Sequence, residues 1–84
     1  MSLTERDFSQ QVIELARLRG WKVYHTWSSI HSPAGFPDLV LTRKGRLIFA
    51  ELKSDKGKLT PAQEEWLASL RETAARVYEW RPTD

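Results

Sequence analysis

The chain has 84 residues, a formal net charge of +2 and no cysteine. A chain of this length is expected to form a single domain over residues 1–84, and without cysteine it holds neither a disulfide bond nor a thiolate zinc site. No apolar run approaches membrane-spanning length and the N-terminus is not a secretory signal, so we expect a cytoplasmic protein with no membrane partner.

The first part of the chain predicts a helix, a strand and a loop. Thr4 and Asp7 have the spacing of a capping box, which would open a helix that runs to about Arg19. Alternating side chains predict a strand at 21–27, and the polar segment 28–36, with its proline and glycine, predicts a loop. The apolar positions that follow helical spacing are Phe8, Val12, Leu15 and Ala16.

The rest of the chain predicts two strands joined by a tight turn, then a helix and a last strand. Thr60 suits the N-cap of this helix, with Pro61 at its first position and Gln63 at its third. The αβββαβ order that results indicates an α/β fold. The predicted elements are strands at 37–43 and 46–53, a helix from Thr60 to about Ala74, and a strand at 76–80.

The two middle strands carry charged side chains where apolar residues would be expected. Asp38 stands at the start of the first, and Glu51 and Lys53 stand at the end of the second. Hard divalent cations take oxygen ligands from acids, and a lysine beside them adds positive charge for a phosphate. This order of residues therefore predicts a metal site that cuts phosphodiesters.

The geometry of the two acids depends on the turn between the strands. We expect Lys44-Gly45 to form a two-residue turn, which places Asp38 opposite Glu51 with the β-carbons about 5 Å apart, where a bound cation relieves their repulsion. Lys53 then projects from the same face, whereas Leu52 points to the other face and offers its backbone carbonyl to the metal. A three-residue turn with a glycine bulge would instead put the two acids on opposite faces.

Two further polar residues each have two interpretations. Glu5 lies on the predicted apolar stripe of the first helix, where it would complete a metal shell or orient a water, or it simply complements the helix dipole. Gln63 would serve the same site, or only bond the N-cap amide of its helix. His25 is expected to be a packed or surface histidine. The tryptophans expected in the core or at a dimer interface are Trp21, Trp27, Trp66 and Trp80.

Basic residues cluster in sequence around the candidate site. From 43 to 58 there are six basic residues against two acids, so we expect a positive patch for phosphates around the site. A solvated hairpin tip is the alternative. His31 would touch a nucleic acid near the site entrance or be a surface loop residue. The other phosphate-contact candidates are Arg43, Lys44, Arg46, Lys56 and Lys58.

Taken together, these motifs resemble a known family. Gly-x-Pro-Asp at 35–38, Glu-x-Lys at 51–53, Gln63-x-x-Trp66 and the terminal segment 77–82 are similar to the VRR-NUC domain of the PD-(D/E)XK nuclease superfamily, in its stand-alone phage and bacterial form. The resemblance covers nearly the whole chain. It implies a restriction-endonuclease-like αβββαβ core, with a mixed central sheet flanked by helices, in a bacterium or a phage-infected host cell.

The resemblance also implies roles for the site residues. Asp38 and Glu51 would bind Mg²⁺ or Mn²⁺, with the Leu52 carbonyl as a further ligand. Lys53 would orient or help deprotonate the attacking water and stabilise charge on the phosphate, and Gln63 would support it. Glu5 matches the helix-one acid of related Holliday-junction resolvases and would serve a second metal.

The expected function is a metal-dependent endonuclease that selects branched DNA by shape. No segment is left for a sequence-reading module, and phosphate contacts do not read sequence. Two symmetric cuts in a four-way junction need two sites, which a homodimer supplies. The alternatives are a nuclease for flaps or single-stranded ends, and an inert DNA-binding module of a larger complex.

Overall fold

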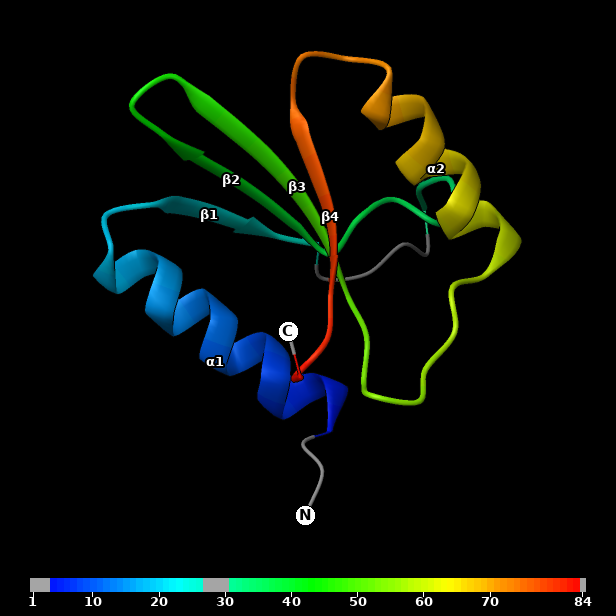
Figure 1. The fold of residues 1–84 in the computed structure, drawn as a ribbon, viewed down its shortest axis with the longest axis horizontal. Coiled ribbons are helices and arrows are strands. Elements are labelled where there is room, and N and C mark those ends of the chain that lie inside the picture. Colours follow the sequence, from blue (N-terminus) through cyan, green and yellow to red (C-terminus); the bar gives the residue numbers. More distant parts are fainter. Residues whose placement is uncertain (1–3, 27–30, 84) are drawn as a thin grey trace.

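The computed structural model describes residues 4–26 and 31–83, and the chain folds in the predicted αβββαβ order. Figure 1 shows the two helices on different sides of the sheet. The elements are α1 (Glu5–Leu18), β1 (Lys22–His25), β2 (Leu39–Arg43), β3 (Arg46–Leu52), α2 (Pro61–Arg71) and β4 (Arg76–Trp80).

Some element ends differ from the sequence-based expectation. β2 begins at Leu39 and not at 37, and α2 ends at Arg71 and not near Ala74. The helix stops early because the amide and the hydroxyl of Thr73 both donate to the Leu70 carbonyl, at 3.0 and 2.6 Å, which closes the last turn. Trp27, at the end of the first predicted strand, lies outside the described residues.

The four strands form one mixed sheet in the order β1-β2-β3-β4. The first three run antiparallel, and β4 runs parallel to β3. A parallel neighbour needs a crossover connection, which α2 provides. This topology confirms the expected α/β core with a mixed sheet and flanking helices.

The turn between β2 and β3 fixes the register of the whole hairpin. Arg43 pairs with Arg46, and both turn residues have positive φ, 48° at Lys44 and 81° at Gly45. Positive φ at both central positions is the mark of a two-residue hairpin turn whose twist matches the strands. The two-residue turn is therefore confirmed, and the glycine bulge is excluded. Leu39 pairs with Ala50, so the preceding position, Asp38, faces Glu51.

The sheet separates two packing layers, because side chains alternate along β3. Ala50 and Leu52 pack with Phe8 of α1 in the main core. The ring of Phe49 belongs to the other layer, where Phe36 lies edge-on to it at 5.9 Å and edge-on to Trp66 of α2 at 5.2 Å. Glu51 and Lys53 follow Phe49 at intervals of two residues, so their side chains point to the same face of the sheet as Phe49. This is the face that α2 covers.

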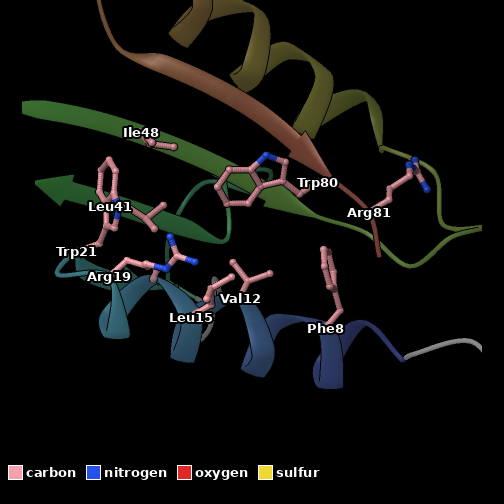
Figure 2. Close-up of a pocket in the computed structure, with 10 residues that line it drawn as sticks. Phe8, Val12, Leu15, Arg19, Trp21, Leu41, Ile48, Trp80 and Arg81 are labelled. Atoms are coloured by element: carbon pink, nitrogen blue, oxygen red, sulfur yellow. The ribbon is translucent and has the colours of Figure 1, made fainter. Parts of the chain in front are cut away.

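The layer on the α1 side contains an apolar groove. Figure 2 shows Trp21 and Trp80 above the side chains of Phe8 and Val12, around a space of about 580 Å³. Trp21 and Trp80 are half-buried and pack against the core cluster, which confirms the expected core role for these two tryptophans. Of the helices in the described ranges, neither has the length and apolar character to cross a lipid bilayer.

Leu67 holds α2 against the sheet, and its loss should destabilise the fold. The side chain is 1% exposed, so Leu67→Ala should lower the free energy of unfolding by about 2–5 kcal/mol through lost burial and a residual cavity. Leu18→Ala is the matched control because Leu18 is 82% exposed, and it should change stability by at most about 0.5 kcal/mol. Urea unfolding measures both, and equal losses would contradict this packing.

Candidate functional site

Asp38 and Glu51 meet where the β2–β3 hairpin leaves the regular ladder. Glu51 is 1% exposed in β3, and Asp38 immediately precedes β2. The Leu52 amide donates to Asp38 Oδ2 at 2.9 Å. Thr26 holds the backbone on the other side, since its amide donates to the Asp38 carbonyl at 2.8 Å and its hydroxyl to the Pro37 carbonyl at 3.0 Å. The position of the Asp38 carboxylate is thus fixed by β1 and β3 together.

Burial and the neighbouring Asp38 strongly perturb the carboxyl group of Glu51. Burial, then a side-chain hydrogen bond with Asp38, then the charge of Asp38 raise the pKa of Glu51 from 4.5 to about 9. The positive charge of Lys53 opposes this shift, and the negative charge of Glu5 adds to it. In the protein alone, Glu51 therefore holds a proton at neutral pH. A divalent cation can replace that proton, because cation binding to acids releases their protons.

One oxygen of Glu51 is left for such a cation. Gln63 Nε2 donates to Glu51 Oε1 across 3.4 Å, while Oε2 is buried and accepts no hydrogen bond from an N–H or O–H group of residues 4–26 and 31–83. A buried carboxylate oxygen without a partner costs free energy that a metal ligand bond recovers. The donor set of carboxylate oxygens beside the Leu52 peptide thus fits a hard divalent cation. Within 4–26 and 31–83, no cluster of three or more His, Cys, Asp or Glu side chains forms, so the fit rests on two acids and the backbone.

Gln63 serves the start of α2 and the acid pair at the same time. Its Oε1 accepts from the Thr60 amide at 2.9 Å, and its own amide donates to Thr60 Oγ1 at 3.2 Å, which completes a capping box. Because the cap uses the oxygen of the side-chain amide, the nitrogen is turned toward Glu51. The structure thus confirms the capping role of Gln63 and also brings its side chain into contact with Glu51.

Lys53 lies beside the acids and is 8% exposed. The chain on both sides of it is anchored to the end of β4: the Lys53 amide donates to the Trp80 carbonyl at 3.0 Å, and Arg81 Nη1 donates to the Ser54 carbonyl at 2.7 Å. The following loop then folds back over the lysine. At Gly57, an added Cβ would stand 3.5 Å from Lys53 Cδ, so the loop covers the stem of this side chain.

Glu5 lies near the pair and not within it. As the first residue of α1 it is exposed, which corrects the expectation of a buried position, because burial along α1 begins only at Phe8. Its charge still acts on Glu51, and its side chain lines a hollow with Asp38 and Leu52.

The same hollow contains residues that the sequence analysis did not select. Its volume is about 720 Å³, and it is lined by residues of α1 together with Asp38 and Leu52. Glu5, Ser9 and Ile13 are spaced by four residues, as are Arg6 and Gln10. Helical spacing from Glu5 could therefore have identified the residues of α1 that line this hollow. The additional lining residues are Arg6, Ser9, Gln10, Ile13 and His25.

The basic residues of the hairpin are far from the acids. Arg43 is five residues along β2 from Asp38, which is about 16 Å of extended chain. The expectation that Arg43, Lys44 and Arg46 surround the site is therefore wrong, because consecutive strand residues lead away from it. Lys56 and Lys58 are exposed in the loop after Lys53, and His31 is exposed in the turn before Gly35.

This sheet, its two helices and the acid pair at the end of the hairpin define the restriction-endonuclease-like fold. The VRR-NUC domain model matches residues 4–82, so the chain belongs to the VRR-NUC family, within the PD-(D/E)XK nuclease superfamily. Membership of this family makes it a nuclease.

Solved structures share this fold. A VRR_NUC domain protein matches with a TM-score of 0.78 and 22% identity over 96% of this chain and 79% of that one. A second VRR_NUC domain matches with a TM-score of 0.72 and 25% identity over 92% and 84%. Hjc, a Holliday junction resolvase from the archaeal hyperthermophile Archaeoglobus fulgidus, matches with a TM-score of 0.66 and 19% identity over 92% and 69%. Curated protein sequences give no significant match.

The raised pKa of Glu51 predicts a pH-dependent stability. In the folded chain Glu51 keeps a proton that it loses above pH 4.5 in the unfolded chain. The contribution of this proton to the free energy of unfolding is complete below pH 4.5 and is lost as the pH rises through about 9. In EDTA, the difference in unfolding free energy between the native chain and Glu51→Gln should change across that interval. Urea titrations at several pH values measure it, and a difference that is independent of pH would contradict the shift.

Proposed function

We propose that the protein is a metal-dependent endonuclease that hydrolyses phosphodiester bonds in DNA and selects branched DNA by shape. The observation that carries this proposal is the pairing of half-buried Asp38 with buried Glu51, whose Oε2 accepts no hydrogen bond from a donor group in the described part of the chain, and the buried Lys53 beside it. A nuclease family, a fitting ligand set and an adjacent ammonium group point to the same chemistry.

The residues have distinct tasks in this proposal. Asp38, Glu51 and the Leu52 carbonyl would hold Mg²⁺ or Mn²⁺, whose charge would polarise the phosphate and lower the pKa of a water. Lys53 places positive charge where negative charge grows on the phosphate in the transition state. Gln63 keeps one oxygen of Glu51 engaged, which directs the other oxygen toward the ligand position.

The DNA would pass over the hollow at the start of α1 and the loop after Lys53. Arg6 and His25 line the hollow, and Lys56 and Lys58 are exposed on the loop. Glu5, in the same hollow, would orient water or a second cation at longer range. The basic groups of Arg6, Lys56 and Lys58 and the imidazole of His25 would contact phosphates and read no base sequence, which favours selection by DNA shape.

Two copies of the chain would act together on a four-way junction. A junction is resolved by symmetric cuts in two strands, and one chain carries one Asp38–Glu51 pair. A twofold homodimer would supply the second site. The similarity to Hjc supports this arrangement, because that protein is a Holliday junction resolvase.

Loss of the acid or the lysine should remove cleavage while the fold remains. Asp38→Ala and Lys53→Ala should each lower the cleavage rate by at least about 10²–10³-fold, since each removes charge that the transition state needs. The matched control is Lys22→Ala, because Lys22 is exposed and pairs with Thr42 near the hairpin end of the sheet. Cleavage of labelled DNA in Mg²⁺ or Mn²⁺, with EDTA as a blank, measures the rates. Full activity of Lys53→Ala would refute its role.

The DNA that is cut should identify the substrate class. Four-way junctions should receive paired symmetric nicks, whereas flaps, duplexes and single strands should be cut slowly or not at all. Sedimentation should give twice the chain mass of 9.8 kDa under the same conditions. Cleavage of flaps alone by a monomer would favour the flap-nuclease alternative, and no cleavage of any DNA would favour an inert binding module.

A further inference from the structure

Gly35 touches the backbone of α2 without any intervening side chain. A Cβ at this position would stand 2.5 Å from the Ala62 carbonyl carbon, 2.6 Å from its oxygen and 2.8 Å from the Gln63 nitrogen. Carbon atoms need about 3.5–4.0 Å, so any side chain here has to move the first turn of α2 by roughly 1 Å. The residue also has a φ of 96°, which glycine adopts without strain.

The residues that follow Gly35 connect this contact to the acid pair. Phe36 packs edge-on against Trp66 of α2 and Phe49 of β3. Pro37 is fully buried, and Asp38 is bonded through its carboxylate to the Leu52 amide at 2.9 Å. The segment 35–38 is therefore held at both ends, with α2 at one end and the acid at the other.

The contact between Gln63 and Glu51 is sensitive to the position of α2. The distance from Gln63 Nε2 to Glu51 Oε1 is 3.4 Å, beyond the usual range of about 2.7–3.2 Å for such a bond. The capping box prevents the side chain from reaching further, because its oxygen is bonded to Thr60. An outward shift of the first turn by roughly 1 Å would therefore break this contact.

We propose that Gly35 is a positioning residue: its lack of a side chain lets α2 approach closely enough for Gln63 to hold Glu51 in its ligand orientation. The proposal rests on the proposed function, in which Glu51 is a metal ligand. Gly35 acts through Gln63 and touches neither cation nor DNA. The glycine of the Gly-x-Pro-Asp segment thus sets the distance between the helix and the acid pair.

The first experiment compares two glycines that share a positive φ. A Cβ at position 35 meets the α2 backbone, whereas a Cβ at position 45, where φ is 81°, meets no atom of the described residues within 4 Å. Alanine is strained at both positions because φ is positive. The difference between the two variants therefore reports only the contact between position 35 and the α2 backbone. Gly35→Ala should lower the cleavage rate by about 10–10²-fold and weaken Mn²⁺ binding in calorimetry, while Gly45→Ala leaves both near the native values. Equal effects of the two variants overturn the proposal.

A double-mutant cycle shows whether Gly35 acts through Gln63. In a Gln63→Ala background, Gly35→Ala should cause little further loss of rate, since the contact it disturbs is already absent. Additive losses mean that Gly35 has only a general structural role, and they overturn the proposal. Gln63→Glu provides a folded comparison, because glutamate keeps the capping oxygen and lacks the amide donor. Undiminished cleavage by Gln63→Glu overturns the proposal even where Gly35→Ala is too unstable to assay.

A spectroscopic readout separates this proposal from the proposed function. The side-chain amide resonances of Gln63 in ¹⁵N-labelled protein should shift in Gly35→Ala and stay unchanged in Gly45→Ala. Unshifted resonances in Gly35→Ala refute the positioning role whatever the enzyme does. Native protein that cuts no DNA, together with the expected shifts, refutes the proposed function and leaves the positioning role supported.

Discussion

The forced proximity of Asp38 and Glu51 is the constraint on which the rest of the site depends. Glu51 is buried beside the half-buried Asp38, and the lost hydration and the neighbouring charge keep Glu51 protonated, with a pKa of about 9. The arrangement is set by the hairpin turn, because a slip of one residue would send one acid to the opposite face of the sheet. The two-residue length of the turn at the far end of the hairpin therefore decides whether the two acids share one face of the sheet.

Residues that obey local rules were predictable from the sequence. The two-residue turn follows from Lys44-Gly45, the capping box from Thr60 and Gln63, and the pairing of the acids from counting back along both strands. The bounds of β4 agree with the prediction because its apolar and aromatic pattern is bounded by clear turn residues. Turn, cap and strand signals that act over a few residues were thus enough to predict the order of the elements and the pairing of Asp38 with Glu51.

The parts that could not be predicted depend on distances between elements. Arg43 and Lys44 are close to the acids in sequence and remote in space, because an extended strand separates them. Glu5 follows the helical spacing of Phe8 and yet is exposed, since burial depends on where the sheet ends beneath α1. The contact of Gly35 with the α2 backbone involves no side chain, so no pattern of residue types reveals it.

A domain this small has little material for a separate shell of supporting residues around its site. Active sites need their ligands held by packing and by outer hydrogen bonds. Here the elements that build the fold provide that support: a helix cap orients Gln63, a strand amide holds Asp38, and the chain around Lys53 is bonded to the end of β4. Stability and ligand geometry are consequently coupled at these positions. A substitution that weakens the cap or moves α2 changes both, whereas the exposed outer face of α1 can vary without affecting the acid pair.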